Sequence, residues 1–205
     1  MDQIENYSNF IKATFDSYYA IEKNSLAHLL SIAKVTNLQK GKLLLDIGQT
    51  SKDIYILYQG AIVSYFINTD GNQYHKNIFL EGDFVGSTVS NLKSEPSQFA
   101  LKAIENTTII SFNYKKYRAL INAHSDLKNF YIAYLEKNWV IDKEQREINI
   151  VMKEASERYL NFIIAHPNIE NRVPLNYIAS HLGITPTQLS RIRKKIKDNR
   201  HNQHM

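Results

Sequence analysis

The hydrophobic and polar positions of this chain follow two patterns, one up to about residue 113 and another beyond it. Six of the seven glycines lie between positions 41 and 86, and the segments between them are short and rich in β-branched and aromatic residues. Such segments, separated by turn residues, are typical of β-strands. We therefore predict strands at 42–45, 53–58, 61–67, 73–80, 99–104 and 107–112, with a hairpin turn at 69–72. The region from about 40 to 113 is expected to be an all-β module, and residues 5–35 before it have helical apolar spacing.

The stretch after the predicted strands lacks the residues that end helices. It has no glycine between Gly86 and Gly183 and no proline between Pro96 and Pro167, so we predict a long helix over 126–153. At about 1.5 Å per residue it would be roughly 42 Å long. Its apolar and amide residues recur at alternating spacings of four and three, as in a coiled coil. They are Leu127, Tyr131, Tyr134, Asn138, Ile141, Gln145, Ile148 and Met152.

This heptad seam predicts a contact between two copies of the chain. Asn138 and Gln145 occupy core positions where polar side chains fix the register of a coiled coil at some cost in stability. A second stripe of Ile132, Leu135 and Trp139 lies about 100° around the helix and is predicted to pack on the β module. The alternative is that the seam packs on its own domain, which would leave no dimerisation helix.

Positive charge is concentrated near the C-terminus. The net charge of the chain is +5, and the sequence pI is about 9.2. Six bases and one acid between Arg191 and Arg200 account for this net charge. Localised positive charge of this kind commonly marks contact with a phosphate backbone. The alternative is a basic tail exposed to solvent.

The residues before and within this basic segment have the pattern of a helix-turn-helix. Ala179 is small where two helices cross closely, and Gly183 stands where the turn needs a positive φ. Thr185 is a suitable N-cap, and Gln188 completes a capping box with it around Pro186. The predicted inward positions are Ile178, Leu182, Ile184, Leu189 and Ile192.

The second helix of this motif is the candidate DNA-binding element. Its outward side chains can donate to base edges and phosphates. The predicted DNA contacts are Thr185, Thr187, Gln188, Ser190, Arg191, Arg193, Lys194, Lys195 and Lys197. Of these, Arg193, Lys194, Lys195 and Lys197 are expected to contact phosphates.

In its order of β module, long helix and C-terminal Leu-x-x-Ile-Ala-x-x-Leu-Gly-Ile-Thr-x-x-x-Leu-Ser-Arg-Ile-Arg motif, the chain resembles the CRP/FNR family of bacterial transcription regulators over residues 20–198. The Glu-Gly-Asp-Phe-Val-Gly run at 81–86 resembles the start of that family's ligand cassette, and Lys-Lys-Tyr at 115–117 resembles the opening of its next helix. Residues 157–160 and 173–175 are similar to a Bacteroidetes branch of the family.

The resemblance implies an α+β fold with three parts. These are a jelly-roll effector domain with flanking helices (1–122), a dimerisation helix (123–153) and a helix-turn-helix domain (154–205). It also implies a homodimer that places two recognition helices in successive major grooves of palindromic double-stranded DNA, with Arg191 reading a guanine. RNA polymerase is a further implied partner. The implied ligand pocket comprises Gly82, Asp83, Phe84, Gly86, Ser87, Gln98 and Phe99.

The sequence departs from the family pattern at the cassette and at the C-terminus. Cyclic-nucleotide binders of this fold have a glutamate after the cassette glycine and an arginine for the cyclic phosphate. Here Ser87 follows Gly86, and the only base over 87–100 is Lys93. Because a buried phosphate needs a fixed cation, we expect neither cAMP nor cGMP to bind with useful affinity. Only eight residues follow Lys197, so we expect no β-hairpin wing.

Other classes of function have little support in the sequence. The chain has no cysteine, which excludes disulfides, thiolate clusters and a cysteine nucleophile. The seven histidines show no ligand pair at helical or hairpin spacing before the C-terminal tail, and we expect surface or capping roles for them. No catalytic or nucleotide-binding motif and no membrane-spanning segment are present. We therefore predict a cytoplasmic regulator that is not an enzyme. Its β module is expected either to bind an unidentified small molecule or to serve only as a dimer scaffold. The alternative is a sensing or protein-interaction module of the same fold that has lost DNA binding.

Overall fold

The computed structural model describes residue 4 and residues 6–202. The strands are β1 (Ala33–Leu38), β2 (Leu43–Leu45), β3 (Asp53–Gln59), β4 (Ile62–Ile67), β5 (Gln73–Phe79), β6 (Phe84–Val85), β7 (Ala100–Ala103) and β8 (Thr107–Asn113). The helices are α2 (Ser8–Asp16), α3 (Lys23–Ile32), α4 (Thr88–Lys93), α5 (Tyr114–Ala123), α6 (Ser125–Leu135), η1 (Glu136–Ile141), α7 (Asp142–Met152), α8 (Ala155–Ala165), α9 (Ile169–Arg172), α10 (Leu175–His181) and α11 (Pro186–Asn202).

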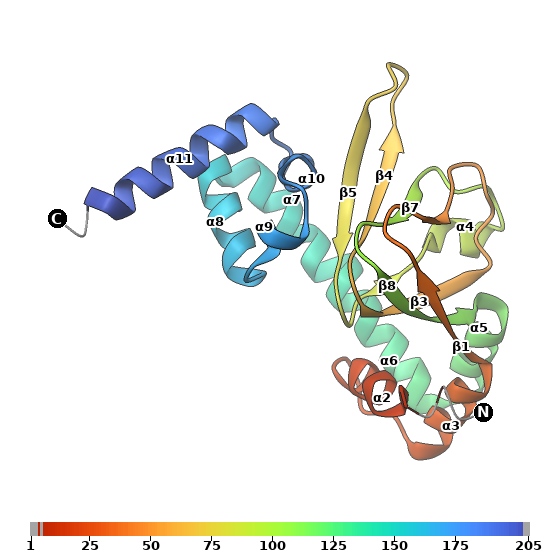
Figure 1. The fold of residues 1–205 in the computed structure, drawn as a ribbon. Helices are drawn as coiled ribbons and strands as arrows, with labels where there is room; N and C mark the ends of the chain where they lie inside the picture. Colours follow the sequence, from red (N-terminus) through yellow and green to blue (C-terminus); the bar gives the residue numbers. More distant parts are fainter. Residues whose placement is uncertain (1–3, 5, 203–205) are drawn as a thin grey trace.

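The strands form a β-roll of two antiparallel sheets, which confirms the predicted α+β fold with an N-terminal jelly-roll-like domain (Figure 1). Within the described residues the strand orders are β1-β8-β3-β6 and β2-β7-β4-β5. The inner faces of the two sheets meet in an apolar cluster that includes Leu57, Ile62, Leu101 and Ile109, each fully buried. All six predicted strands are present, with small differences at their ends.

The sequence-based prediction missed three elements of this domain. Strand β1 pairs with β8 from Ala33 to Leu38, although residues up to 35 were expected to be helical. The apolar spacing of α3, which ends at Ile32 directly before β1, was extended into the strand. The strand itself alternates mostly between half-buried and exposed residues. The two-residue strand β6 and the short helix α4 were also missed, because both are shorter than a recognisable period.

A second apolar cluster joins the N-terminal helices to the β-roll. Phe15 of α2, Phe84 of β6 and Phe130 of α6 pack against one another with ring centroids 4.3 to 5.6 Å apart. Leu127 and Tyr117 are buried in the same cluster. This packing fixes the start of the long helix on the β-roll.

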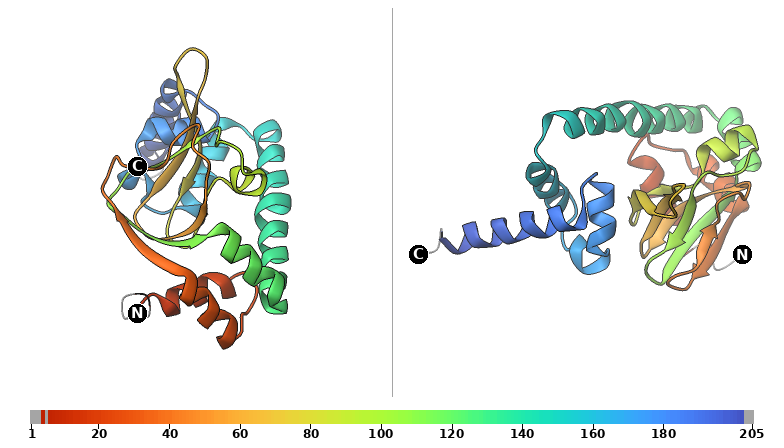
Figure 2. Two further views of the ribbon diagram at one scale, coloured as in Figure 1. Left: turned by 90° about the vertical axis from the view of Figure 1, so that its right-hand side faces the viewer. Right: turned by 90° about the horizontal axis from the view of Figure 1, so that it is seen from above.

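The long helix runs from Ser125 to Met152 as α6, η1 and α7, close to the predicted 126–153, and Figure 2 shows it as a rod along one side of the molecule. Its middle segment η1 is a π-helix, in which an extra residue per turn shifts the faces that follow. There Asn138 donates from Nδ2 to the carbonyl oxygen of Tyr134 at 2.9 Å. The predicted seam is therefore not continuous along one face.

The C-terminal helices α8 to α11 lie together at the far end of the rod (Figure 1). They share a buried apolar cluster that also includes three residues of the β-roll: its members include Tyr159, Ile169, Ile178, Ala179 and Leu189, together with Ala61, Val63 and Ile104. Helix α11 extends away from the β-roll toward the C-terminus (Figures 1 and 2). Within the described residues, no helix has both the length and the apolar character needed to cross a membrane.

Candidate nucleic-acid interface

Helices α10 and α11, joined by a turn, cover the residues for which a helix-turn-helix was predicted. Gly183 has a φ of +69°, a conformation that glycine adopts without steric cost. The N–H of Ile184 donates to the carbonyl oxygen of Ala179 at 3.0 Å, which closes the turn after α10. Ala179 and Ile178 are fully buried, and Leu189 is 1% exposed. These contacts hold the two helices against each other and fix the direction of α11.

The start of α11 is fixed by a reciprocal capping box. The Thr185 hydroxyl accepts from the N–H of Gln188 at 3.1 Å, and the Gln188 side chain accepts from the N–H of Thr185 at 2.9 Å. Two backbone donors that the helix itself leaves unpaired are thereby satisfied. The side-chain oxygen of Gln188 is occupied by this role, so Gln188 has its amide nitrogen left for another contact.

The exposed surface of α11 carries most of the side chains proposed to contact DNA. The exposed ones, with the preceding N-cap, are Thr185, Thr187, Gln188, Ser190, Arg191, Lys194, Lys195 and Lys197. Arg191 lies one turn after Thr187 and next to Ser190, so polar donors follow one another along the exposed surface. The same helix turns Leu189 inward. This arrangement has the amphipathic form that a recognition helix requires.

Arg193 differs from the other bases of α11. It is half-buried, and its Nε lies 2.7 Å from Oε1 of Glu170 in α9. The same oxygen of Glu170 accepts from the Tyr159 hydroxyl at 2.7 Å. Arg193 thus ties α11 to α8 and α9, and its predicted phosphate contact would require this ion pair to be shared or broken.

The residues expected to form a ligand pocket differ in burial and in their contacts. Phe84 packs beneath the N-terminal helices, and Gln98 and Asp83 are exposed. Ser87 is 2% exposed, and its hydroxyl oxygen lies 3.0 Å from the hydroxyl oxygen of Ser97, within hydrogen-bonding distance. The Ser97 hydroxyl donates to the carbonyl oxygen of Phe99 at 2.7 Å. The Ser87 and Ser97 hydroxyls are thus engaged with each other and with the Phe99 carbonyl oxygen.

The predicted dimer residues divide at η1. Leu127 is fully buried, and Tyr131 and Tyr134 pack against the same core of their own domain, so the prediction is wrong for Leu127. Ile141 and Ile148 beyond η1 are 62% and 46% exposed. The amide of Gln145 is bound within the helix to Asn149.

The second stripe was also predicted wrongly. Ile132 and Trp139 are 53% and 44% exposed, and they do not pack on the β-roll. The physical reason is that the face of α6 buried in the domain core is the opposite one, where Leu127 and Phe130 lie. The rod exposes apolar side chains from both stripes and from other positions. From the stripes these are Ile132, Trp139, Ile141, Ile148 and Met152, and from other positions Val140, Ile150 and Val151.

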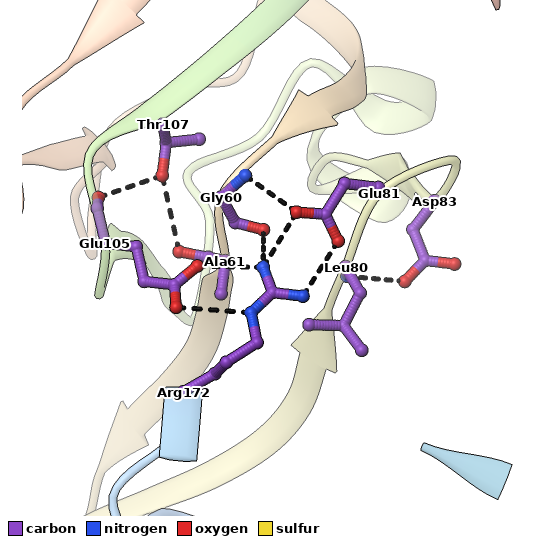
Figure 3. A network of polar contacts seen from close by, with 8 residues as sticks. All are labelled: Gly60, Ala61, Leu80, Glu81, Asp83, Glu105, Thr107 and Arg172. Carbon is purple, nitrogen blue, oxygen red and sulfur yellow. Dashed lines mark hydrogen bonds and ion pairs between the residues drawn. The ribbon is translucent and has the colours of Figure 1, made fainter. Parts of the chain in front are cut away.

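An ion network that the sequence did not reveal ties the helix-turn-helix domain to the β-roll (Figure 3). Arg172 of α9 donates to Glu81 at 2.7 Å, to Glu105 at 2.8 Å and to the carbonyl oxygen of Gly60 at 2.9 Å. The hydrogen bonds that Arg172 donates to Glu105 and Glu81 raise the pKa of Arg172. Burial acts to raise the pKa of Glu81, but the hydrogen bond from Arg172 lowers it overall. We refer to these four residues as the Arg172 network.

A second contact between the domains lies between α10 and β5. The Ser180 hydroxyl accepts from the N–H of His75 at 2.8 Å, and Nδ1 of His181 lies 3.0 Å from the carbonyl oxygen of Lys76. The His75 ring stacks on Tyr177 with centroids 3.7 Å apart. His75 is 6% exposed, so the prediction of a surface or capping role is wrong for it. Burial lowers the pKa of both His75 and His181 to about 4.

Comparison with known proteins supports both the β-roll and the complete arrangement. Residues 35–124 match the profile of the cyclic nucleotide-binding domain. A search of curated proteins finds no significant match. Among solved structures, the c-di-GMP responsive global regulator CLP of Xanthomonas campestris is 13% identical with a TM-score of 0.66, and the match covers 87% of this chain and 93% of CLP.

Two further structures show the same fold. FixK2 from Bradyrhizobium japonicum is 18% identical with a TM-score of 0.66, over 82% of this chain and 86% of FixK2. The catabolite activator protein of Thermus thermophilus is 14% identical with a TM-score of 0.55, over 89% of this chain and 86% of that protein. The class defined by the fold is thus a β-roll of the cyclic nucleotide-binding type joined by a long helix to C-terminal helices. More narrowly, the chain has the fold of the CRP/FNR-type regulators, as its sequence indicated.

Proposed function

We propose that this protein is a transcription regulator of the CRP/FNR type that binds a palindromic promoter site as a homodimer. The observation that carries the proposal is α11, a capped helix whose apolar side is buried and whose exposed surface presents Thr187, Ser190 and Arg191. Arginine in the major groove makes two hydrogen bonds to guanine. Contact with RNA polymerase and residence in the bacterial cytoplasm are part of the same proposal.

The charge of α11 supports DNA as the partner. Lys194 and Lys195 are exposed and follow Arg191 on the same helix, where they would lie near the strands that flank a major groove. Such cations release counterions from DNA and strengthen binding to every sequence alike. Base reading by Arg191 and phosphate contacts by the lysines are therefore separable roles.

The rod supports the homodimer. Ile141, Ile148 and Val151 are 62%, 46% and 81% exposed. Figure 2 shows none of the other described helices or strands along the outer side of the rod. An extended apolar face of this kind marks a protein contact. A two-fold pairing of rods would bring two copies of α11 into one assembly, as a palindromic site requires.

Substitution of Arg191 tests base reading. We expect Arg191→Ala to weaken binding to the preferred duplex by about 1 to 3 kcal/mol and to relax preference at one base pair. Lys194→Ala is the matched control: it should weaken binding to all duplexes alike and lower the slope of log affinity against log salt by about one. Both can be measured by fluorescence anisotropy over a range of salt. Equal losses on specific and random duplexes for Arg191→Ala would contradict the base-reading role.

The regulator is proposed to act without cAMP or cGMP. Ser87 and Ser97 hydrogen-bond to each other where a cyclic phosphate would need donors, and the cassette provides no arginine. Calorimetry with the full chain should show no saturable cAMP binding in the micromolar range. A micromolar dissociation constant for cAMP would contradict this part of the proposal.

A further inference from the structure

An open cleft of about 400 Å³ lies between the β-roll and the helix-turn-helix domain. On the β-roll side it is lined by Lys40, Lys102 and Ile104, and on the other side by Arg172, Val173 and Tyr177. Its volume falls in the range of roughly 300 to 1,000 Å³ that small-molecule sites occupy. None of the residues of the ligand cassette lines it, so it is a different place in the fold.

The two lysines of this cleft have no partners. Within the part of the chain that the structure describes, neither the Lys40 nor the Lys102 ammonium group has a hydrogen-bond or ion-pair partner. The nearby carboxylates are already engaged, since Glu105 binds Arg172 and Glu170 binds Arg193. Among the described residues, no acid pairs with the Lys40 or Lys102 ammonium group, and the one carboxylate in the lining, that of Glu170, is paired with Arg193.

The electrostatic effect of Lys102 is visible at a neighbouring side chain. Burial lowers the pKa of His75, and the positive charge of Lys102 lowers it further. The His75 ring stacks on Tyr177, which lines the cleft. An anion bound at Lys102 would therefore lie near the stacked His75 and Tyr177 rings.

The rest of the lining combines the polar side chains of Glu170, Asn171 and Arg172 with an apolar part. Ala103 and Ile104 are buried at the end of β7, and Val173 is 2% exposed beside them on the segment that leads into α10. Over these buried side chains, the half-buried Leu175 and Tyr177 give the cleft an apolar surface that suits the body of an aromatic ligand, since ligand sites combine apolar walls with a few placed charges. The cleft thus has a cationic part at Lys40 and Lys102 and an apolar part at Leu175 and Tyr177.

We propose that this cleft binds a small organic anion with an aromatic body, a carboxylate or a phosphate ester, through Lys40 and Lys102. Such a ligand would contact both domains at once and would stabilise the arrangement that the Arg172 network holds. Binding itself is independent of DNA. Its consequence for transcription, as the effector of the regulator, rests on the proposed function.

The test uses the full chain and three probes: 1-naphthoate, phenyl phosphate and the neutral 1-naphthamide. Titration followed by calorimetry and by amide chemical shifts should show saturable binding of 1-naphthoate or phenyl phosphate, at least about tenfold tighter than that of 1-naphthamide, because the charged end adds an ion pair. Lys40→Met and Lys102→Met should each weaken anion binding at least about fivefold. Lys34→Met, which changes an exposed lysine of β1 in the other sheet, is the matched control and should leave binding unchanged.

The proposal is overturned if neither anion binds saturably, if 1-naphthamide binds as tightly as 1-naphthoate, or if Lys40→Met and Lys102→Met both bind like the unchanged protein. Should Lys102→Met fail to fold by circular dichroism, the exposed Lys40 decides the outcome alone. The assay contains no DNA, so its result is separate from that of Arg191→Ala. A protein that binds 1-naphthoate but no duplex would retain this site and lose the proposed function.

Discussion

Gly60 shows at the scale of one residue how the two domains are connected. Its φ is +104°, and a Cβ there would lie 2.6 Å from the hydroxyl oxygen of Thr107. Its N–H donates to Glu81 at 2.9 Å, and its carbonyl oxygen accepts from Arg172. Only glycine fits this turn between β3 and β4. The turn thereby presents a carbonyl and a positioned carboxylate to a helix more than a hundred residues further along the chain.

Arg172→Gln tests the Arg172 network. Because the guanidinium is about one-third exposed, we expect a loss of about 1 to 2 kcal/mol in the free energy of unfolding, between the values for surface and buried ion pairs. Urea denaturation measures this loss. Lys93→Gln is the matched control, since its pair with Glu95 spans 3.8 Å between exposed groups and should contribute almost nothing. Equal stability of the two variants would contradict the account.

At the scale of elements, much of the fold could be predicted from local signals. The strands 53–58, 61–67 and 73–80 were predicted because glycines and a Thr-Asp-Gly-Asn turn separate them. The capping box of Thr185 and Gln188 was predicted from residues three positions apart, and the hydrogen bonds confirm it. Such features depend on residues a few positions apart, and this spacing can be read directly from the sequence.

The predictions that failed depended on contacts formed only in the complete fold. The heptad pattern did not show that η1 would change the face of the helix, nor that the core of the β-roll would bury Leu127. The Arg172 network and the pairing of Arg193 with Glu170 join residues far apart in the chain. Nothing in the spacing of these charges indicates their partners, because the partners are brought together only by the complete fold.

The exposed apolar surface of helix α7 is the proposed dimer contact. Ile148→Asp places a charge on the exposed apolar face of the rod and should shift the protein from dimer to monomer, since a charge buried without a partner opposes association. Val89→Asp is the matched control, because Val89 is also exposed, at 56%, but lies on α4. Sedimentation velocity distinguishes the two states. A dimer that survives Ile148→Asp, or an unchanged protein that is monomeric, would contradict the proposed use of the rod.

At the scale of the whole molecule, the contact between α10 and β5 is sensitive to protons. The folded protein holds His75 and His181 with pKa values of about 4, against an ordinary value of 6.5. Lys102 and the Tyr177 ring face His75, and Arg146 and His166 face His181. Burial and these nearby positive charges oppose protonation of both rings, so the unfolded chain binds protons more readily than the folded one.

The sign of the resulting pH dependence follows from this difference. Stability contributed by the two neutral rings is present above about pH 6.5 and is lost as the pH falls toward about 4. Urea denaturation at a series of pH values should show the free energy of unfolding decreasing across this window. The double variant His75→Gln, His181→Gln should have a smaller decrease. An unchanged slope in the double variant would assign the pH dependence to other groups.

The central claim concerns α11 and the assembly that presents it. The most direct measurement is selection of bound duplexes from a random pool by the purified full chain, at near-physiological salt, followed by sequencing. The account predicts enrichment of a palindrome whose half-sites are centred about one helical turn of DNA apart, roughly 34 Å. A pool that remains random after repeated rounds, at low as well as moderate salt, would contradict it.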